Sequence, residues 1–122
     1  MGNRKNILIY TFVFIFFVIV SWLLYTLHIK KIYENRLSLA SLTLEKVQAD
    51  VAVFGTDWCN YCEKTRSYLE SEGVKYYWID IEKGTENKKL YDRFGASGVP
   101  LIITKHLIIE GYKINDLAKI KN

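Results

Sequence analysis

The chain has 122 residues, which is enough for one small domain and an additional segment. Residues 1–50 carry six basic and three acidic side chains, whereas residues 51–122 carry eleven and ten, so the net charge of +4 comes mainly from the first part. The nearly neutral second part gives no electrostatic support for nucleic-acid binding. Two cysteines exclude a fold that is held together by several disulfides.

A membrane-spanning helix is predicted for residues 7–28, after a short basic tail over residues 1–6. No Asp, Glu, Lys or Arg lies between Asn6 and Ile29, and a helix of this length rises roughly 30 Å, the thickness of a bilayer's hydrocarbon core. A cleavable signal peptide is the alternative, but its apolar core is usually shorter and ends at small residues. We therefore expect an uncleaved single-pass anchor. Aromatic residues that suit the headgroup regions are Tyr10, Trp22 and Tyr25.

The basic residues on the two sides of this segment do not predict its orientation. Arg4 and Lys5 precede it, and Lys30, Lys31 and Arg36 follow it. Cytoplasmic flanks of membrane helices usually carry more Lys and Arg than the other flank, and the difference here is too small to decide the topology. Charge alone therefore allows the rest of the chain to lie on either side of a membrane.

Residues 29–50 are predicted to form a helical stalk or linker. Neither Pro nor Gly interrupts them, and Leu39 and Leu42 outside the apolar stripe suggest that the stalk packs against another part of the chain. We interpret the stripe itself as a packing face. Its members recur near helical spacing and are Ile29, Ile32, Tyr33, Leu37, Ala40, Leu44 and Val47.

Residues 51–122 are predicted to fold as an α/β domain with the element order β-α-β-α-β-β-α. We expect strands at residues 51–54, 76–81, 101–104 and 107–109. The intervening helices begin near Asn60, Thr85 and Asn115, and we expect Thr85 and Asn115 to cap theirs. The first helical crossover makes strands one and two parallel, and the short connection at residues 105–106 makes the last two a hairpin. A four-stranded mixed sheet with helices on both faces is expected.

The two cysteines, Cys59 and Cys62, stand where the first strand of this domain turns into a helix. A thiol at a helix N-terminus faces unpaired amides and the positive end of the helix dipole, which lower its pKa. The thiolate can attack a disulfide, and a second thiol one turn later can displace the partner, so the pair favours dithiol–disulfide exchange. A zinc site needs four ligands, and His28 and His106 are far apart in the sequence. A purely structural disulfide would close only a small loop.

Two motifs in this domain resemble those of the glutaredoxin family, which belongs to the thioredoxin superfamily. The stretch Gly55-Thr56-Asp57-Trp58-Cys59-Asn60-Tyr61-Cys62 is similar to the family's active-site sequence, and Gly98-Val99-Pro100 is similar to its loop before the third strand. Together with the element order, the resemblance covers about residues 51–121. It implies a thioredoxin-like fold of three layers.

The resemblance also implies roles for individual residues. Cys59 would be the attacking thiol and Cys62 the resolving thiol. Pro100 would be a cis proline beside the cysteines, which leaves the Val99 backbone free to pair with an extended substrate. The side chain of Tyr61 would flank the substrate groove. The other residues assigned to substrate binding are Trp58, Gly98, Gly111 and Tyr112.

Three features depart from the family pattern. Asn60 replaces the usual Pro between the cysteines, where the residue type influences the reduction potential. The second departure, from the glutathione-binding pattern, lies at Glu110-Gly111-Tyr112-Lys113, which keeps one Gly of the usual pair. The cation Lys113 stands near the position where the family usually has the acid that receives the charged end of glutathione. This stretch is more similar to glutaredoxin-like donors that thioredoxin reductase recharges. An anchor is unusual for a general cytosolic reductant and favours an extracytoplasmic, periplasmic location.

The sequence therefore predicts a membrane-anchored thiol–disulfide oxidoreductase that works through a mixed-disulfide intermediate. Its substrates would be protein disulfides or glutathione mixed disulfides, with glutathione as a candidate co-substrate. We expect no bound cofactor, no metal and no nucleic-acid partner. Two other classes of function stay open: an iron–sulfur-cluster-binding module with Cys59 and glutathione as ligands, and a non-catalytic membrane partner protein.

Overall fold

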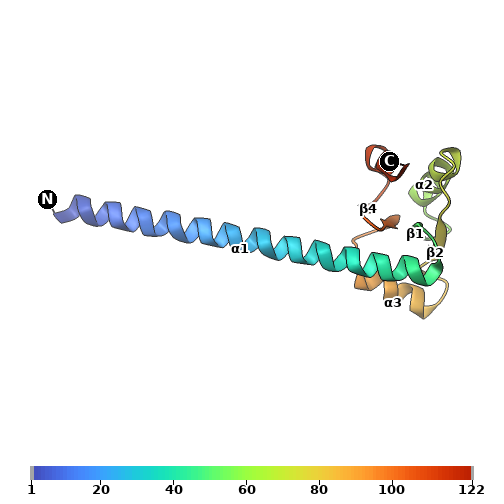
Figure 1. The fold of residues 1–122 in the computed structure, drawn as a ribbon, viewed down its shortest axis with the longest axis horizontal. Coiled ribbons are helices and arrows are strands. Elements are labelled where there is room, and N and C mark those ends of the chain that lie inside the picture. The colour runs from blue at the N-terminus through green and yellow to red at the C-terminus, as the bar shows by residue number, and fades with distance from the viewer. Residues whose placement is uncertain (1, 122) are drawn as a thin grey trace. The chain divides into compact units, whose positions relative to one another are not determined.

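The computed structural model describes residues 2–121 and divides the chain into two compact units, one ending at Asn35 and one beginning at Arg36. A single long helix, α1, contributes to both units, and the remaining elements belong to the second (Figure 1). In chain order the elements are α1 (Gly2–Val47), β1 (Val51–Gly55), α2 (Asn60–Ser71), β2 (Tyr77–Asp80), α3 (Thr85–Arg93), β3 (Leu101–Thr104), β4 (Ile108–Glu110), α4 (Ile114–Leu117) and the 3-10 helix η1 (Ala118–Lys121).

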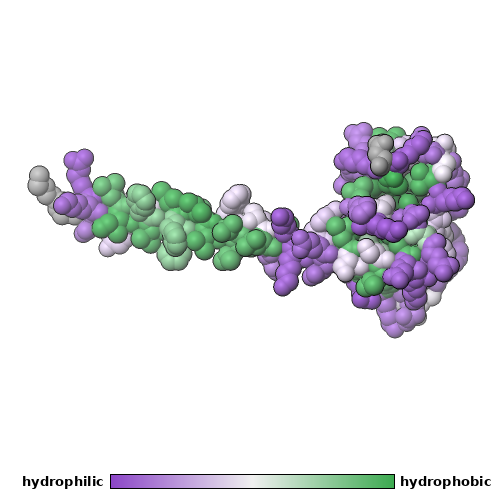
Figure 2. Space-filling view, in the orientation of Figure 1, coloured by the Kyte–Doolittle hydropathy of each residue, from purple (hydrophilic) through white to green (hydrophobic). Residues whose placement is uncertain are grey.

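The first unit is the apolar part of α1. Figure 2 shows hydrophobic side chains along this stretch, and none of its most apolar window is buried. By length and composition this is one helix that can cross a membrane, among the residues that the structure describes. A signal sequence near an N-terminus would meet the same criteria of length and apolar composition.

The second unit is built on a four-stranded sheet with the strand order β2-β1-β3-β4. Strand β1 runs parallel to β2 and antiparallel to β3, with Val53 opposite both Trp78 and Ile102. Strands β3 and β4 form an antiparallel pair in which Leu101 faces Glu110. The mixed sheet, the parallel first pair and the final hairpin are thus confirmed.

Helices cover both faces of this sheet. Alternate residues of β1 point to opposite faces, so this strand packs against helices on both. Ala52 and Phe54 pack on one side with the last quarter of α1 and with α3. Val51 and Val53 pack on the other side with Leu69 of α2 and with α4. All of β1 is buried, which explains why its sequence is an apolar run rather than an alternating one. The three-layer α/β architecture is confirmed.

The last quarter of α1, from Arg36 to Val47, belongs to the α/β domain. Ala40, Thr43 and Leu44 are buried, and Ala40 and Leu44 join Phe54 in one apolar cluster. The compact unit therefore begins at Arg36, whereas the sequence alone placed the domain boundary at Val51. The physical reason is that this face of the sheet would otherwise expose its apolar side chains to water.

The two predicted helix caps are wrong by one or two residues. The N-cap of α3 is Gly84, with Thr85 as the first helical residue, and the N-cap of α4 is Lys113, with Asn115 inside the helix. No side-chain hydrogen bond caps the start of either helix. At Gly84 the backbone has a φ of +106°, a turn that glycine adopts without the steric cost of a side chain.

Candidate active site

The two cysteines lie at the start of α2, directly after the buried strand β1. Cys59 is the N-cap residue of the helix, with extended backbone angles, and Cys62 lies in its first turn. The two side chains form a disulfide, with their Cα atoms 5.2 Å apart. The Cys62 backbone N–H points at the Cys59 sulfur, 3.1 Å away. This helix N-terminus would therefore stabilise negative charge on Cys59 after reduction.

The two sulfur-bearing residues differ in accessibility. Cys59 is 9% exposed, whereas Cys62, in the first turn of α2, is only 1% exposed. Cys59 is therefore the more accessible of the two cysteines. Cys62 is bonded to Cys59 and is almost completely shielded from solvent.

The loop before β3 faces the disulfide with its backbone. The Val99–Pro100 peptide bond is cis, as the family resemblance implies, and the Pro100 side chain is buried. The carbonyl oxygen of Val99 lies 3.9 Å from the Cys59 sulfur. The Pro100 carbonyl accepts a hydrogen bond of 2.8 Å from the Gly111 N–H. Gly98 carries the exposed turn of this loop beside the disulfide.

Two exposed aromatic residues, Trp58 and Tyr61, directly precede the two cysteines in the chain. Trp58 is 73% exposed, and its indole N–H donates to both carboxylate oxygens of Glu82 at 3.0 and 3.1 Å. Tyr61 is exposed and stacks on half-buried Tyr112, with ring centroids 6.4 Å apart and planes tilted by 20°. The Lys64 ammonium lies 5.3 Å from the Tyr61 ring centroid. The structure thus brings every residue assigned to substrate binding to the disulfide end of the sheet.

Charged residues that the sequence analysis missed lie next to the loop between β1 and α2. The Lys83 ammonium bridges Asp57 at 2.6 Å and Asp80 at 3.1 Å. The Glu82 backbone N–H, followed by Lys83, holds the pKa of the Asp80 carboxyl below its usual value. A signal was present in the sequence: Asp80 ends a strand parallel to β1, and the carboxyl ends of adjacent parallel strands lie together.

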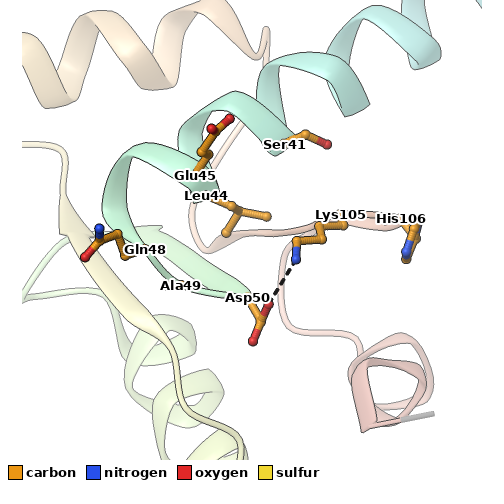
Figure 3. Close-up of a pocket in the computed structure, with 8 residues that line it drawn as sticks. All are labelled: Ser41, Leu44, Glu45, Gln48, Ala49, Asp50, Lys105 and His106. Carbon is orange, nitrogen blue, oxygen red and sulfur yellow. Dashed lines mark hydrogen bonds and ion pairs between the residues drawn. The ribbon is translucent and has the colours of Figure 1, made fainter.

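Two hollows lie at opposite ends of the sheet. A polar cavity of about 390 Å³ opens beside Cys59 and is lined by Asp57, Glu63 and Arg66, among others. A second hollow, of about 560 Å³, lies between the last turns of α1 and the connection between β3 and β4 (Figure 3). There Lys105 pairs with Asp50 at 3.3 Å. The strand directions place this second hollow at the opposite end of the sheet from the cysteines.

No metal-binding cluster of His, Cys, Asp or Glu occurs in residues 2–121. Within that range the chemistry that the site supports is carried by two sulfurs, a helix N-terminus and a free backbone edge. A mixed sheet, a Cys-x-x-Cys pair at a helix start and a facing cis proline together define a dithiol protein of the thioredoxin superfamily.

Comparison with known proteins identifies the branch of that superfamily. Residues 51–108 match the family model described as Glutaredoxin. The solved glutaredoxin grx-1 of Archaeoglobus fulgidus is 29% identical, with a TM-score of 0.55 over 61% of this chain and 87% of that chain. Residues 51–108 therefore match a glutaredoxin-family domain, and the general chemistry of that family is thiol–disulfide exchange.

More distant proteins share the fold. NrdH-redoxin from Escherichia coli is 17% identical, with a TM-score of 0.54 over 57% of this chain and 91% of that chain. A buckwheat glutaredoxin in complex with glutathione is also 17% identical, with a TM-score of 0.52 over 71% of this chain and 91% of its own. The gene 56 protein of Mycobacterium phage D29 is 30% identical over 57 residues, which is 46% of this chain. The chain spans 63% of that phage protein's length.

Proposed function

We propose that this protein is a membrane-anchored thiol–disulfide oxidoreductase in which Cys59 attacks and Cys62 resolves. The observation that carries the proposal is the difference in exposure between the two sulfurs, at a helix N-terminus that faces the Val99 carbonyl. A buried second thiol cannot be reached by a bulky client, but it can reach the first. The geometry therefore supports an ordered exchange of two disulfides.

The reaction balances as a two-electron transfer. In the reduced protein the Cys59 thiolate attacks one sulfur of a client disulfide, forms a mixed disulfide and releases the other client sulfur as a thiolate. Cys62 loses its proton to solvent and attacks the Cys59 sulfur. This step forms the Cys59–Cys62 disulfide and releases the second client sulfur. The client is reduced and the protein is oxidised; an external thiol or dithiol then returns the two electrons. The same steps in reverse would oxidise a client dithiol.

An extended protein segment is the client that fits the site best. The Val99 backbone lies next to Cys59, where a client strand can add its own hydrogen bonds. Exposed Trp58 and the stacked pair of Tyr61 and Tyr112 offer apolar area close to the cysteines. Lys113, rather than an acid, follows Tyr112, which gives the carboxylates of glutathione a different setting from the usual one.

The catalytic assignment is tested by trapping the intermediate. The full chain in mild detergent is reduced and mixed with insulin or hydroxyethyl disulfide, with dithiothreitol or glutathione as alternative reductants. Cys62→Ser should accumulate a mixed disulfide on Cys59 that mass spectrometry detects, and Cys59→Ser should form none. Turnover that survives Cys59→Ser would contradict the proposal. Turnover with dithiothreitol but not with glutathione would assign the protein to the dithiol-dependent class.

The anchor is part of the same proposal, with residues 7–28 as the transmembrane span. Its support is the length and the exposed apolar surface of this part of α1. Alkaline extraction of membranes should leave the full chain in the pellet, and release into the supernatant would refute the anchor. A membrane-impermeant maleimide applied to reduced intact cells tests the expected extracytoplasmic location, because it reaches Cys59 only if the domain faces outward.

A further inference from the structure

Arg36 begins the last quarter of α1 and lies at the active-site end of the sheet. It is one turn before Ala40 and two turns before Leu44, so the three share one face of the helix. Residues 36–47 rise roughly 16 Å, about the length of the five-residue strand β1. Because Val47 is followed closely by the start of β1, Arg36 lies at the opposite end of the sheet, where the disulfide is.

The guanidinium of Arg36 contacts the last residue of β4. It donates a hydrogen bond to one carboxylate oxygen of Glu110, and the two side chains are only 23% and 32% exposed. The other carboxylate oxygen is 3.5 Å from the Ser97 hydroxyl, which donates to it. The Arg36 hydrogen bond, followed by its charge, holds the pKa of the Glu110 carboxyl below its usual value, and Ser97 acts in the same direction.

These contacts support the loop that presents the backbone edge to Cys59. Ser97 precedes Gly98 and Val99 in this loop. The Tyr91 hydroxyl donates a hydrogen bond of 2.8 Å to the Gly98 carbonyl. The preceding residue, Ser97, is held instead by its hydrogen bond to Glu110. Without Arg36, a partly buried carboxylate at Glu110 would be unpaired and would turn toward water. Ser97 would then lose its partner, and the loop would be less well ordered.

We propose that Arg36 is a positioning residue, which holds Glu110 and Ser97 and thereby orders the Val99 backbone edge for an extended protein substrate. The inference rests on the proposed oxidoreductase function and deepens it. It assigns a role in substrate binding to a residue on the helix that carries the membrane segment. Arg36 and Glu110 both lie outside the matched range of the glutaredoxin family model, residues 51–108. The positioning contact therefore joins two residues that flank the matched range, one on each side.

This role predicts an effect that depends on the substrate. A small disulfide needs only the Cys59 sulfur, whereas a protein segment also needs an ordered backbone edge. In the full chain, Arg36→Gln should raise KM for a reducible protein disulfide about tenfold and change kcat little, because binding rather than sulfur exchange is impaired. The rate with the small reagent 5,5′-dithiobis(2-nitrobenzoate) should stay within about twofold of the wild-type value. Arg36→Lys, which keeps the charge but not the planar fork, should restore KM in part.

The matched control is Lys121→Gln, which removes a surface ion pair with Glu72 and touches no part of the loop. Hydrogen exchange of the Ser97 and Gly98 amides should accelerate in Arg36→Gln and not in Lys121→Gln. Equal losses toward protein and small disulfides in Arg36→Gln, or no loss toward either, would overturn the positioning role. A wild-type chain that reduces neither substrate would instead refute the proposed function itself, so the two failures are distinguishable.

Discussion

Truncation of Leu44 to Ala tests whether the end of α1 is part of the α/β domain. Leu44 is 1% exposed and belongs to the apolar cluster that contains Phe54 of β1. On the same helix, two residues earlier, Leu42 is 61% exposed. Leu42→Ala is therefore a matched control, with the same chemical change and the same helix propensity but no buried contact.

The expected cost of Leu44→Ala follows from its burial. Removing a buried leucine side chain costs about 2 to 5 kcal/mol, depending on how far the surroundings collapse into the cavity. Leu44 borders the hollow of about 560 Å³ beneath α1, where water can enter, so we expect about 3 kcal/mol. Leu42→Ala should change the free energy of unfolding by less than about 0.5 kcal/mol. With a urea m-value of about 1 to 1.5 kcal/mol/M, Leu44→Ala lowers the midpoint by roughly 2 to 3 M.

Urea unfolding of the full chain in mild detergent, followed by the fluorescence of half-buried Trp78, measures both variants. A protein that begins to fold only at Val51 would show equal, small effects for Leu44→Ala and Leu42→Ala. That result would refute our placement of the domain start at Arg36. It would also mean that residues 51–122 are sufficient for a stable fold.

Three further predictions concern single positions. A Cβ at Gly55 would clash with the Trp78 ring and approach the Cys62 sulfur to 2.9 Å. Gly55→Ala should therefore lower the free energy of unfolding by about 1 to 3 kcal/mol. Gly98→Ala is the control for the same denaturation measurement, because a Cβ at Gly98 would have open space. Gln48 has a positive φ of 54° after the end of α1, so Gln48→Gly should stabilise the domain by about 0.5 to 1 kcal/mol in thermal unfolding, whereas Gln48→Ala should not. The folded-state pKa of Glu110 is below its unfolded value, so its contribution to stability is present above the unfolded pKa and is lost as the pH falls through the folded pKa. Stability measured between about pH 3 and pH 6 should therefore fall less steeply on acidification in Glu110→Gln than in the wild type, and identical profiles would contradict the Arg36 pairing.

Much of the domain could be predicted because its elements carry strong local signals. The apolar runs at residues 51–54 and 101–104 became buried strands with nearly the predicted bounds. The short connection at residues 105–106 became the hairpin turn. Local signals failed at helix starts, where Thr85 and Asn115 are typical caps but the chain turns slightly earlier. A cap depends on the backbone direction of the preceding loop, which a sequence pattern does not specify.

The candidate site divides in the same way. Cys59, Cys62 and Pro100 could be found because a pair of cysteines at a strand–helix junction and the chain's single proline are recognisable without a structure. The Arg36–Glu110 contact could not be found, because the two residues are 74 positions apart and have no local pattern in common. Ion pairs across a fold depend on which helix covers which face of the sheet.

By itself, the sequence determined the apolar segment, the order of strands and helices, and the two sulfurs at the start of α2. These features follow from hydrophobic periodicity and from residue chemistry over short distances. Only the tertiary structure decided that the last quarter of α1 completes the core, that Cys59 is more accessible than Cys62, and that Arg36 pairs with Glu110. The physical reason is that burial and charge pairing are properties of surfaces brought together by folding, and residues remote in the chain contribute to each surface.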